Sequence, residues 1–283
     1  MNDLQQRLVK MVDKMPAFPS SVSRVLQLTS DINCSPKELV QVIDHDPVMT
    51  VKILKLVNSA YFGLARKIIS VNQAVVFVGI NTIKNLALTI ATMGMLPKEN
   101  RAGMNMTRFL LHSLGSATVA KMLSQRLDVP PLESTDYFVA GLLHDFGKVV
   151  FAQFMPSEFE RALKRAEKGK MELHLSEMEE VGADHSQLGG MLGEKWQLPA
   201  DLVTCIREHH APVSTGKVAM MRDCVIAANE ITKFADFGNA GSCVVEAFPE
   251  GVAQRFNMEV KELAGSLTNL SEELEKTRIF IRL

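Results

Sequence analysis

The spacing of apolar residues is the clearest structural signal in this chain. Along most of its 283 residues, apolar side chains recur three or four positions apart, as on one buried helix face. Between residues 107 and about 127, the side chains expected to point inward are Leu110, Leu111, Leu114, Ala117 and Met122. A terminal amphipathic helix is predicted through Val260, Leu263, Leu267, Leu270 and Leu274. Residues 74–78 are rich in β-branched side chains, but no alternating run is long enough to predict a strand.

Residues typical of helix ends divide this pattern into short helices. Ser35-Pro36-Lys37-Glu38 has the form of a capping box with a proline in the first turn. Asp46-Pro47 predicts the start of the next helix in the same way. Ser70 with Gln73 predicts a further start, and Gly79 a helix end. The sequence therefore predicts an all-α protein built from short helices and tight turns.

A polar segment divides the chain into two expected lobes. Residues 97–103 contain Lys98, Glu99, Asn100 and Arg101 and form the best linker in the sequence. We expect an N-terminal helical lobe over residues 1–100 and a second helical lobe over residues 104–237, followed by a C-terminal helical extension over residues 238–283. The expected architecture is a two-lobed helical bundle.

The charge balance argues against a nucleic-acid or membrane partner. Lys and Arg total 31 against 32 Asp and Glu, so the chain has no net positive field for DNA or an anionic membrane. No apolar run is long enough for a membrane span, and no secretory leader is recognisable, so we expect a cytoplasmic location. The cysteines are too widely spaced for a zinc or redox pair and are expected to be reduced thiols: Cys34, Cys205, Cys224 and Cys243.

The stretch with the most distinctive chemistry is the His144-Asp145 pair, which follows an apolar run. Ser134 or Thr135 is expected to cap the helix that ends at this pair. An imidazole beside a carboxylate suits Mn, Fe, Ni or Zn better than Ca or Mg. The alternative is a core histidine with a satisfied hydrogen bond beside an ion-paired aspartate. Other histidines of the second lobe and its surroundings are His112, His174, His185, His209 and His210.

These motifs resemble those of a known family. His112 and the His144-Asp145 pair match the first two parts of the pattern of the HD superfamily of metal-dependent phosphohydrolases. More closely, the chain resembles the HDOD family, a divergent HD-like branch found in bacterial signalling. The matching segments are Asp46-Pro47, residues 53–60, residues 141–148, residues 196–199 and residues 209–212.

The resemblance implies a set of metal ligands in an HD-like second lobe. His112, His144 and Asp145 would hold a first ion, and further ions would be held with the help of His185, His209 and His210. Lys148 would face a phosphate, or else would only extend along the surface at a helix end. We expect His45 and His174, which match no motif, to be surface residues.

Two departures from the family pattern weaken the case for catalysis. The expected final Asp is replaced by Asn229, whose neutral amide removes an anionic ligand. The segment after His210 also lacks the Gly-Tyr-Pro signature of the cyclic-dinucleotide hydrolases. Two hypotheses therefore remain. The favoured one is a non-catalytic regulatory protein with a vestigial or weak metal site and other signalling proteins as partners. The alternative is a metal-dependent phosphohydrolase acting on a nucleotide.

Overall fold

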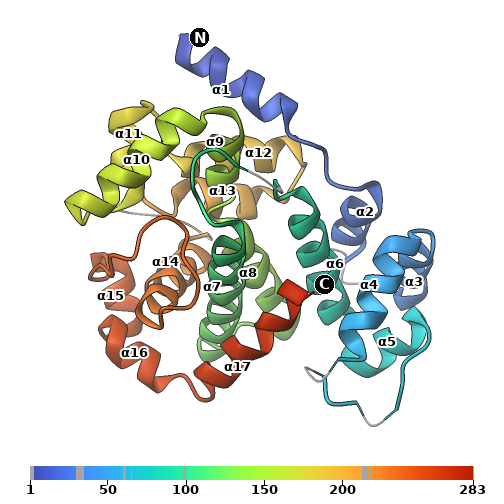
Figure 1. Cartoon of the computed structure of the whole chain (residues 1–283). Helices are drawn as coiled ribbons and strands as arrows, with labels where there is room; N and C mark the ends of the chain where they lie inside the picture. Colours follow the sequence, from blue (N-terminus) through green and yellow to red (C-terminus); the bar gives the residue numbers. More distant parts are fainter. Residues whose placement is uncertain are drawn as a thin grey trace. The chain divides into compact units, whose positions relative to one another are not determined.

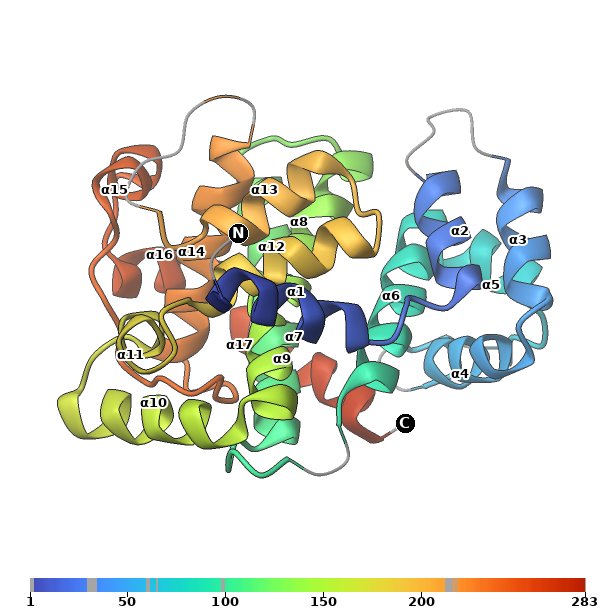
Figure 2. The same cartoon turned by 90° about the horizontal axis from the view of Figure 1, so that it is seen from above.

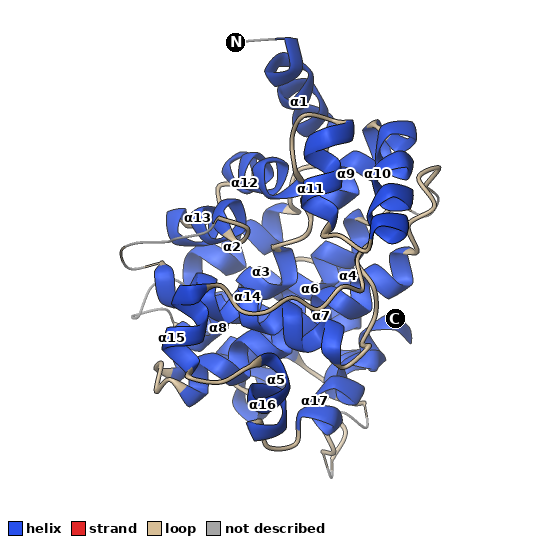
Figure 3. Ribbon diagram, turned by 90° about the vertical axis from the view of Figure 1, so that its left-hand side faces the viewer, coloured by secondary structure: helices blue, strands red, loops and turns tan. Residues whose placement is uncertain are grey.

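A computed structural model describes residues 3–29, 35–59, 62–64, 66–97, 100–211, 216 and 218–282. Within these ranges all of the regular secondary structure is helical, and Figure 3 shows helices joined by loops. The all-α fold predicted from the apolar pattern is confirmed. The expectations for Cys34 and for Lys98 and Glu99 of the linker fall on residues outside the described ranges.

The chain forms two compact units. The larger unit comprises Met1–Pro16 and Leu96–Leu274, and the smaller unit comprises Ala17–Met95 and Glu275–Leu283. The units differ from the expected lobes because residues 1–16 group with the histidine-bearing part of the chain. Most of the expected C-terminal extension, up to Leu274, also groups with that part.

The helices of the larger unit surround α7, the longest helix in the described residues (Figures 1 and 2). This unit contains α1 (Asp3–Lys14), α7 (Met106–Arg126), α8 (Pro131–Leu143), α9 (Gly147–Phe154), α10 (Pro156–Gly169), α11 (Leu173–Glu180), α12 (His185–Lys195), α13 (Ala200–Glu208), α14 (Ala219–Phe234), α15 (Glu250–Phe256) and α16 (Val260–Ser266). The smaller unit contains α2 (Ser20–Thr29), α3 (Pro36–Asp44), α4 (Pro47–Val57), α5 (Val71–Val78), α6 (Ile80–Met95) and a 3-10 helix (Arg278–Arg282). The boundary between the units falls within α17 (Leu270–Thr277).

Local capping signals fix several helix starts. Asp46 Oδ1 accepts a hydrogen bond from Met49 N at 3.0 Å, and Ser70 Oγ accepts one from Gln73 N at 3.2 Å. Gly79 ends α5 with φ at +84°, a backbone conformation that favours glycine. At α3 the Ser35 hydroxyl accepts from Lys37 N at 3.3 Å, so the cap forms there.

Two expected helix boundaries are wrong. The helix before His144 begins at Pro131, because proline is well suited to a first turn, and so Ser134 and Thr135 lie inside it. The expected terminal helix is split into α16 and α17. Asn269 has φ at +60°, which no α-helix accommodates, although the apolar spacing continues across the break.

The described residues include no single helix that is long and apolar enough to cross a membrane. α5 and α6 meet the length and composition criteria only as a pair, and they are bent by 118° at their junction.

The close packing of α8 on α7 positions the histidines described below. α7 is buried on most of its surface and packs against α8 and α14, although Met122 is only part-buried. Gly141 of α8 lies directly against α7, because a Cβ atom there would lie 2.7 Å from Ser116 O and 2.8 Å from Ala117 Cα. The two helix backbones can therefore approach only if residue 141 has no side chain.

We predict that Gly141→Ala lowers the free energy of unfolding by about 1–3 kcal/mol, because the new methyl group must push α8 away from α7. Urea denaturation followed by circular dichroism measures this change. Gly265→Ala in α16 is the matched control, since a Cβ atom at residue 265 would meet nothing within 4 Å. The control should leave stability unchanged or raise it by up to about 1 kcal/mol. Equal losses in both variants would contradict this account of the α7–α8 contact.

Candidate metal centre

Six of the chain's seven histidines form one connected group inside the larger unit. Ring centroids 4.0–5.8 Å apart link each member to another. The group consists of His112, His144, His174, His185, His209 and His210. The seventh, His45, is exposed at the C-terminal end of α3, as expected.

Helix ends deliver most of these side chains to the same point. His112 lies within α7, His144 follows α8, His185 begins α12, and His209 and His210 follow α13. α9 and α12 approach closely at Gly147, where a Cβ atom would lie 1.9 Å from His185 O. The absence of a side chain at residue 147 therefore lets the start of α12 lie beside the turn that carries Asp145.

The Asp145 carboxylate lies at the centre of the group and is 2% exposed. Its Oδ1 is 3.1 Å from His185 Nε2 and 3.9 Å from His209 Nε2. Its Oδ2 is 3.4 Å from His144 Nε2 and 3.6 Å from His112 Nε2. One carboxylate thus lies between two pairs of imidazoles. His185 and His209 face its Oδ1, and His144 and His112 face its Oδ2.

Lys148 supplies a positive charge inside the centre. Its Nζ lies 2.8 Å from Asp145 Oδ2, but the alignment does not make a hydrogen bond, and within the described residues Oδ2 has none. His144 Nε2 is likewise buried without a hydrogen-bond partner among those residues. Buried polar atoms are rarely left in this state without a ligand. The Lys148 ammonium therefore neutralises Asp145 without filling all of the acceptor positions around it.

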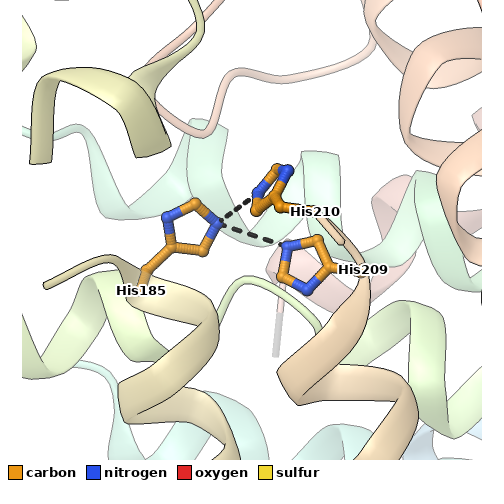
Figure 4. Close-up of side chains that lie close together, drawn as sticks. All are labelled: His185, His209 and His210. Carbon is orange, nitrogen blue, oxygen red and sulfur yellow. Dashed lines mark hydrogen bonds between the residues drawn. The ribbon is translucent and has the colours of Figure 1, made fainter. Parts of the chain in front are cut away.

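His185, His209 and His210 have the spacing of ligands around one ion. His185 Nε2 lies 3.3 Å from His209 Nε2 and 3.0 Å from His210 Nε2 (Figure 4). Two ligands of one transition-metal ion are about 3.0–3.4 Å apart when each bond is about 2.1 Å long. The 3.1 Å separation between His185 Nε2 and Asp145 Oδ1 falls in the same range. These four side chains could hold one divalent ion.

Hydrogen bonds on the far side of the rings fix which nitrogen faces the centre. His144 and His209 each donate Nδ1–H to a backbone carbonyl, at 2.8 and 2.7 Å. His185 Nδ1 lies 2.6 Å from Glu177 Oε2, which also accepts the His185 backbone N–H at 2.8 Å. An imidazole that donates through Nδ1 presents the lone pair of Nε2, and a carboxylate behind it strengthens that ligand.

The ionisation states also suit a cation. Burial lowers the pKa of His209 and of His210 well below the usual value, so both rings are neutral. Burial opposes a charge on His185, but the Glu177 and Asp145 carboxylates outweigh it and raise the pKa of His185 to about 9. Burial alone would raise the pKa of Asp145, yet the positive groups beside it hold it well below its usual value. A bound ion would replace the proton that His185 otherwise carries.

His112 has a different partner. Its Nε2 lies 2.9 Å from Asn229 Oδ1, and Asn229 Nδ2 donates to Glu230 Oε1 at 2.9 Å. Burial lowers the pKa of His112 to about 3, so its ring is neutral. His112, His144 and Asp145 nevertheless form a second group whose ligand atoms lie within 4.8 Å of one another.

A small opening leads toward the histidines. This pocket of about 170 Å³ is bordered by α11, α13, α14 and the segment before α15. Its lining includes the side chains of Glu172, Glu230 and Glu246 together with His174, His209 and His210. Lys148 does not border it.

The structure brings together every residue expected as a metal ligand and places three further residues beside them: His174, Glu177 and Glu230. The expectation that His174 is a surface residue is met only in part, because its side chain is part-buried and stacks on His210, although it borders the opening. Glu177 and Glu230 have no distinctive sequence context, since nothing in the sequence distinguishes them from solvated carboxylates. Glu177 lies eight residues before His185, but this single spacing belongs to no repeated pattern. The sequence therefore does not link the two residues.

The fold and the buried His-Asp group agree with a match to a family model. The model of the HDOD domain matches residues 15–212. The chain belongs to the HDOD family.

Individual relatives support the fold. An uncharacterized protein of Treponema pallidum (strain Nichols) is 25% identical over 260 residues, which cover 89% of this chain and 48% of that protein. The chain thus spans about half the length of this curated relative. A solved HDOD domain protein of unknown function from Geobacter sulfurreducens has a TM-score of 0.81 at 24% identity, covering 99% of this chain and 100% of that one. A protein from Shewanella amazonensis SB2B, provisionally named a phosphohydrolase, has a TM-score of 0.73 at 23% identity, with 98% of each chain covered.

We predict that the purified protein binds one Zn²⁺ ion per chain and that His185→Ala and His210→Ala each abolish this binding. Glu177→Gln should weaken it about 10–100-fold, because the carboxylate that orients His185 is lost. Isothermal titration calorimetry after treatment with a chelator measures both effects. His45→Ala removes a histidine outside the group and should leave binding unchanged. Identical zinc binding in all four variants would show that the group is not the site.

Proposed function

We propose that this protein is a regulatory HDOD protein that binds one transition-metal ion, turns over no nucleotide and acts through other signalling proteins. The observation that carries the proposal is the 2.9 Å hydrogen bond between His112 and Asn229. Because Asn229 Nδ2 donates to Glu230, its Oδ1 faces His112, and His112 Nε2 must be the donor. A protonated nitrogen has no lone pair to offer to a metal ion.

This hydrogen bond occupies both His112 Nε2 and Asn229 Oδ1. Neither atom is then free to bind an ion beside His144 and Asp145, the position that hydrolysis would need. Metal-assisted hydrolysis depends on an ion that lowers the pKa of a bound water or polarises a phosphoryl oxygen. At His112, His144 and Asp145, one imidazole is occupied and the nearby amide is neutral. The Lys148 ammonium, 2.8 Å from Asp145 Oδ2, also repels a further cation. The ion is therefore proposed to bind at Asp145, His185, His209 and His210.

The opening toward the histidines supports the same proposal. Its volume of about 170 Å³ is below the roughly 300–1,000 Å³ typical of small-molecule sites. Three glutamates border it, and Lys233 compensates for only part of their charge. A nucleotide phosphate would meet carboxylates of like charge, whereas a divalent cation would be attracted.

The alternative is a metal-dependent phosphohydrolase that acts on nucleotides. The Shewanella amazonensis SB2B protein of similar fold carries that provisional name. The second ligand group, His112, His144 and Asp145, is the observation in this chain that favours it. Turnover would require His112 to exchange its Asn229 hydrogen bond for an ion.

We predict that phosphate release from nucleotides and cyclic dinucleotides, with Mn²⁺ supplied, is the same for the wild-type protein and for Asp145→Ala. The physical reason is that the one proposed ion already has four protein ligands, and the position bounded by His112, His144 and Asp145 keeps too few free ligands to hold an ion that activates water. Phosphate release and chromatography of the products measure turnover. Rapid turnover that is lost in His144→Ala and in Asp145→Ala would overturn the proposed function.

A further inference from the structure

A chain of buried polar contacts lies behind His112. Lys233 Nζ is 2.6 Å from Glu172 Oε1 and 2.8 Å from Glu230 Oε1. Glu230 Oε1 accepts a hydrogen bond from Asn229 Nδ2 at 2.9 Å, and Glu230 Oε2 accepts the backbone N–H of Glu246 at 2.8 Å. The side chains of Glu172, Glu230 and Lys233 are all at most 7% exposed. Both carboxylate oxygens of Glu230 are therefore committed to donors.

These contacts fix the orientation of the Asn229 amide. A carboxylate only accepts hydrogen bonds, so Glu230 must face the NH₂ group of Asn229 and not its oxygen. The amide oxygen is then left to face His112 Nε2 at 2.9 Å. Reversal of the amide would place two oxygens 2.9 Å apart in a buried site, which is strongly unfavourable.

The same geometry determines which side chain residue 229 can be. A carboxylate at this position would place an oxygen about 2.9 Å from Glu230 Oε1, where Asn229 Nδ2 now lies. Two carboxylates at that distance repel each other strongly in a buried site. Lys233, the cation in contact with Glu230, is already shared between Glu230 and Glu172. Glu230 therefore favours an amide over an acid at residue 229.

We propose that Glu230 is a positioning residue that restricts the centre to one ion by excluding a carboxylate at residue 229. This inference rests on the proposed function, in which one ion binds at Asp145, His185, His209 and His210. The excluded position is the one bounded by His112, His144 and Asp145. Restoring a carboxylate at residue 229 is not sufficient to fill it, because Glu230 must also be neutralised.

The test is a double-mutant cycle read by Zn²⁺ titration calorimetry. The wild-type protein, Asn229→Asp and Glu230→Gln should each bind one ion. The combination of Asn229→Asp with Glu230→Gln should bind two, with the second ion at least tenfold tighter than any second ion in Asn229→Asp alone. A second ion bound as tightly by Asn229→Asp alone as by the combination would overturn the inference.

A matched control separates contact from net charge. Asn229→Asp combined with Glu246→Gln has the same net charge as the test combination and removes a carboxylate from the same opening. The Glu246 side chain is exposed, and its backbone N–H, not its carboxylate, contacts Glu230. This control should bind one ion. Two ions in the control would mean that general electrostatics, and not Glu230, restricts the centre.

The ring of His112 gives a second readout that needs no metal and no variant. In the metal-free wild-type protein, ¹⁵N NMR of the imidazole should show His112 protonated at Nε2. Protonation at Nδ1 instead would overturn the inference, because the amide would then be reversed. The two proposals can fail separately: nucleotide turnover by the wild-type protein contradicts the proposed function, whereas a tightly bound second ion in Asn229→Asp alone contradicts only the role of Glu230.

Discussion

The burial of the Asp145 carboxylate is the constraint on which the larger unit depends. A charge removed from water is tolerated only when other groups compensate it, and here Lys148 and the imidazoles of the centre surround it. Those groups come from α7, the turn between α8 and α9, and the ends of α12 and α13. The close approaches at Gly141 and Gly147 are what allow these elements to reach one carboxylate.

Charge balance within the centre explains how the Asn229 amide can limit the number of ligands that are free to bind an ion. Asp145 and Glu177 are the carboxylates that contact its imidazoles, and each already has a positive or polar partner. Asn229 adds no negative charge and occupies His112 through a hydrogen bond. The set of ligands is thus divided into a group that faces Asp145 Oδ1 and a group that is partly occupied by protein contacts.

Membership of the HDOD family and the distribution of charge bear on function in different ways. The family match and the similar solved structures define the helical framework, which can serve both regulation and hydrolysis. The distinction between these functions lies in a few contacts: the state of His112, the ammonium beside Asp145 and the acidic opening. The acidic opening favours a cation over a phosphate, whereas the state of His112 and the Lys148 ammonium oppose a second cation beside Asp145 Oδ2.

The sequence alone determined the helical class, the caps at Asp46 and Ser70, and the ligand types around His144 and Asp145, because periodicity and capping are set by residues close together in the chain. It could not show the break at Asn269, since the apolar spacing continues through it. The tertiary structure alone decided that Glu177 supports His185, that His174 stacks on His210 and that Glu230 orients Asn229. The physical reason is that the partner of a buried polar group is chosen by packing between distant segments, and neither composition nor local spacing carries that information.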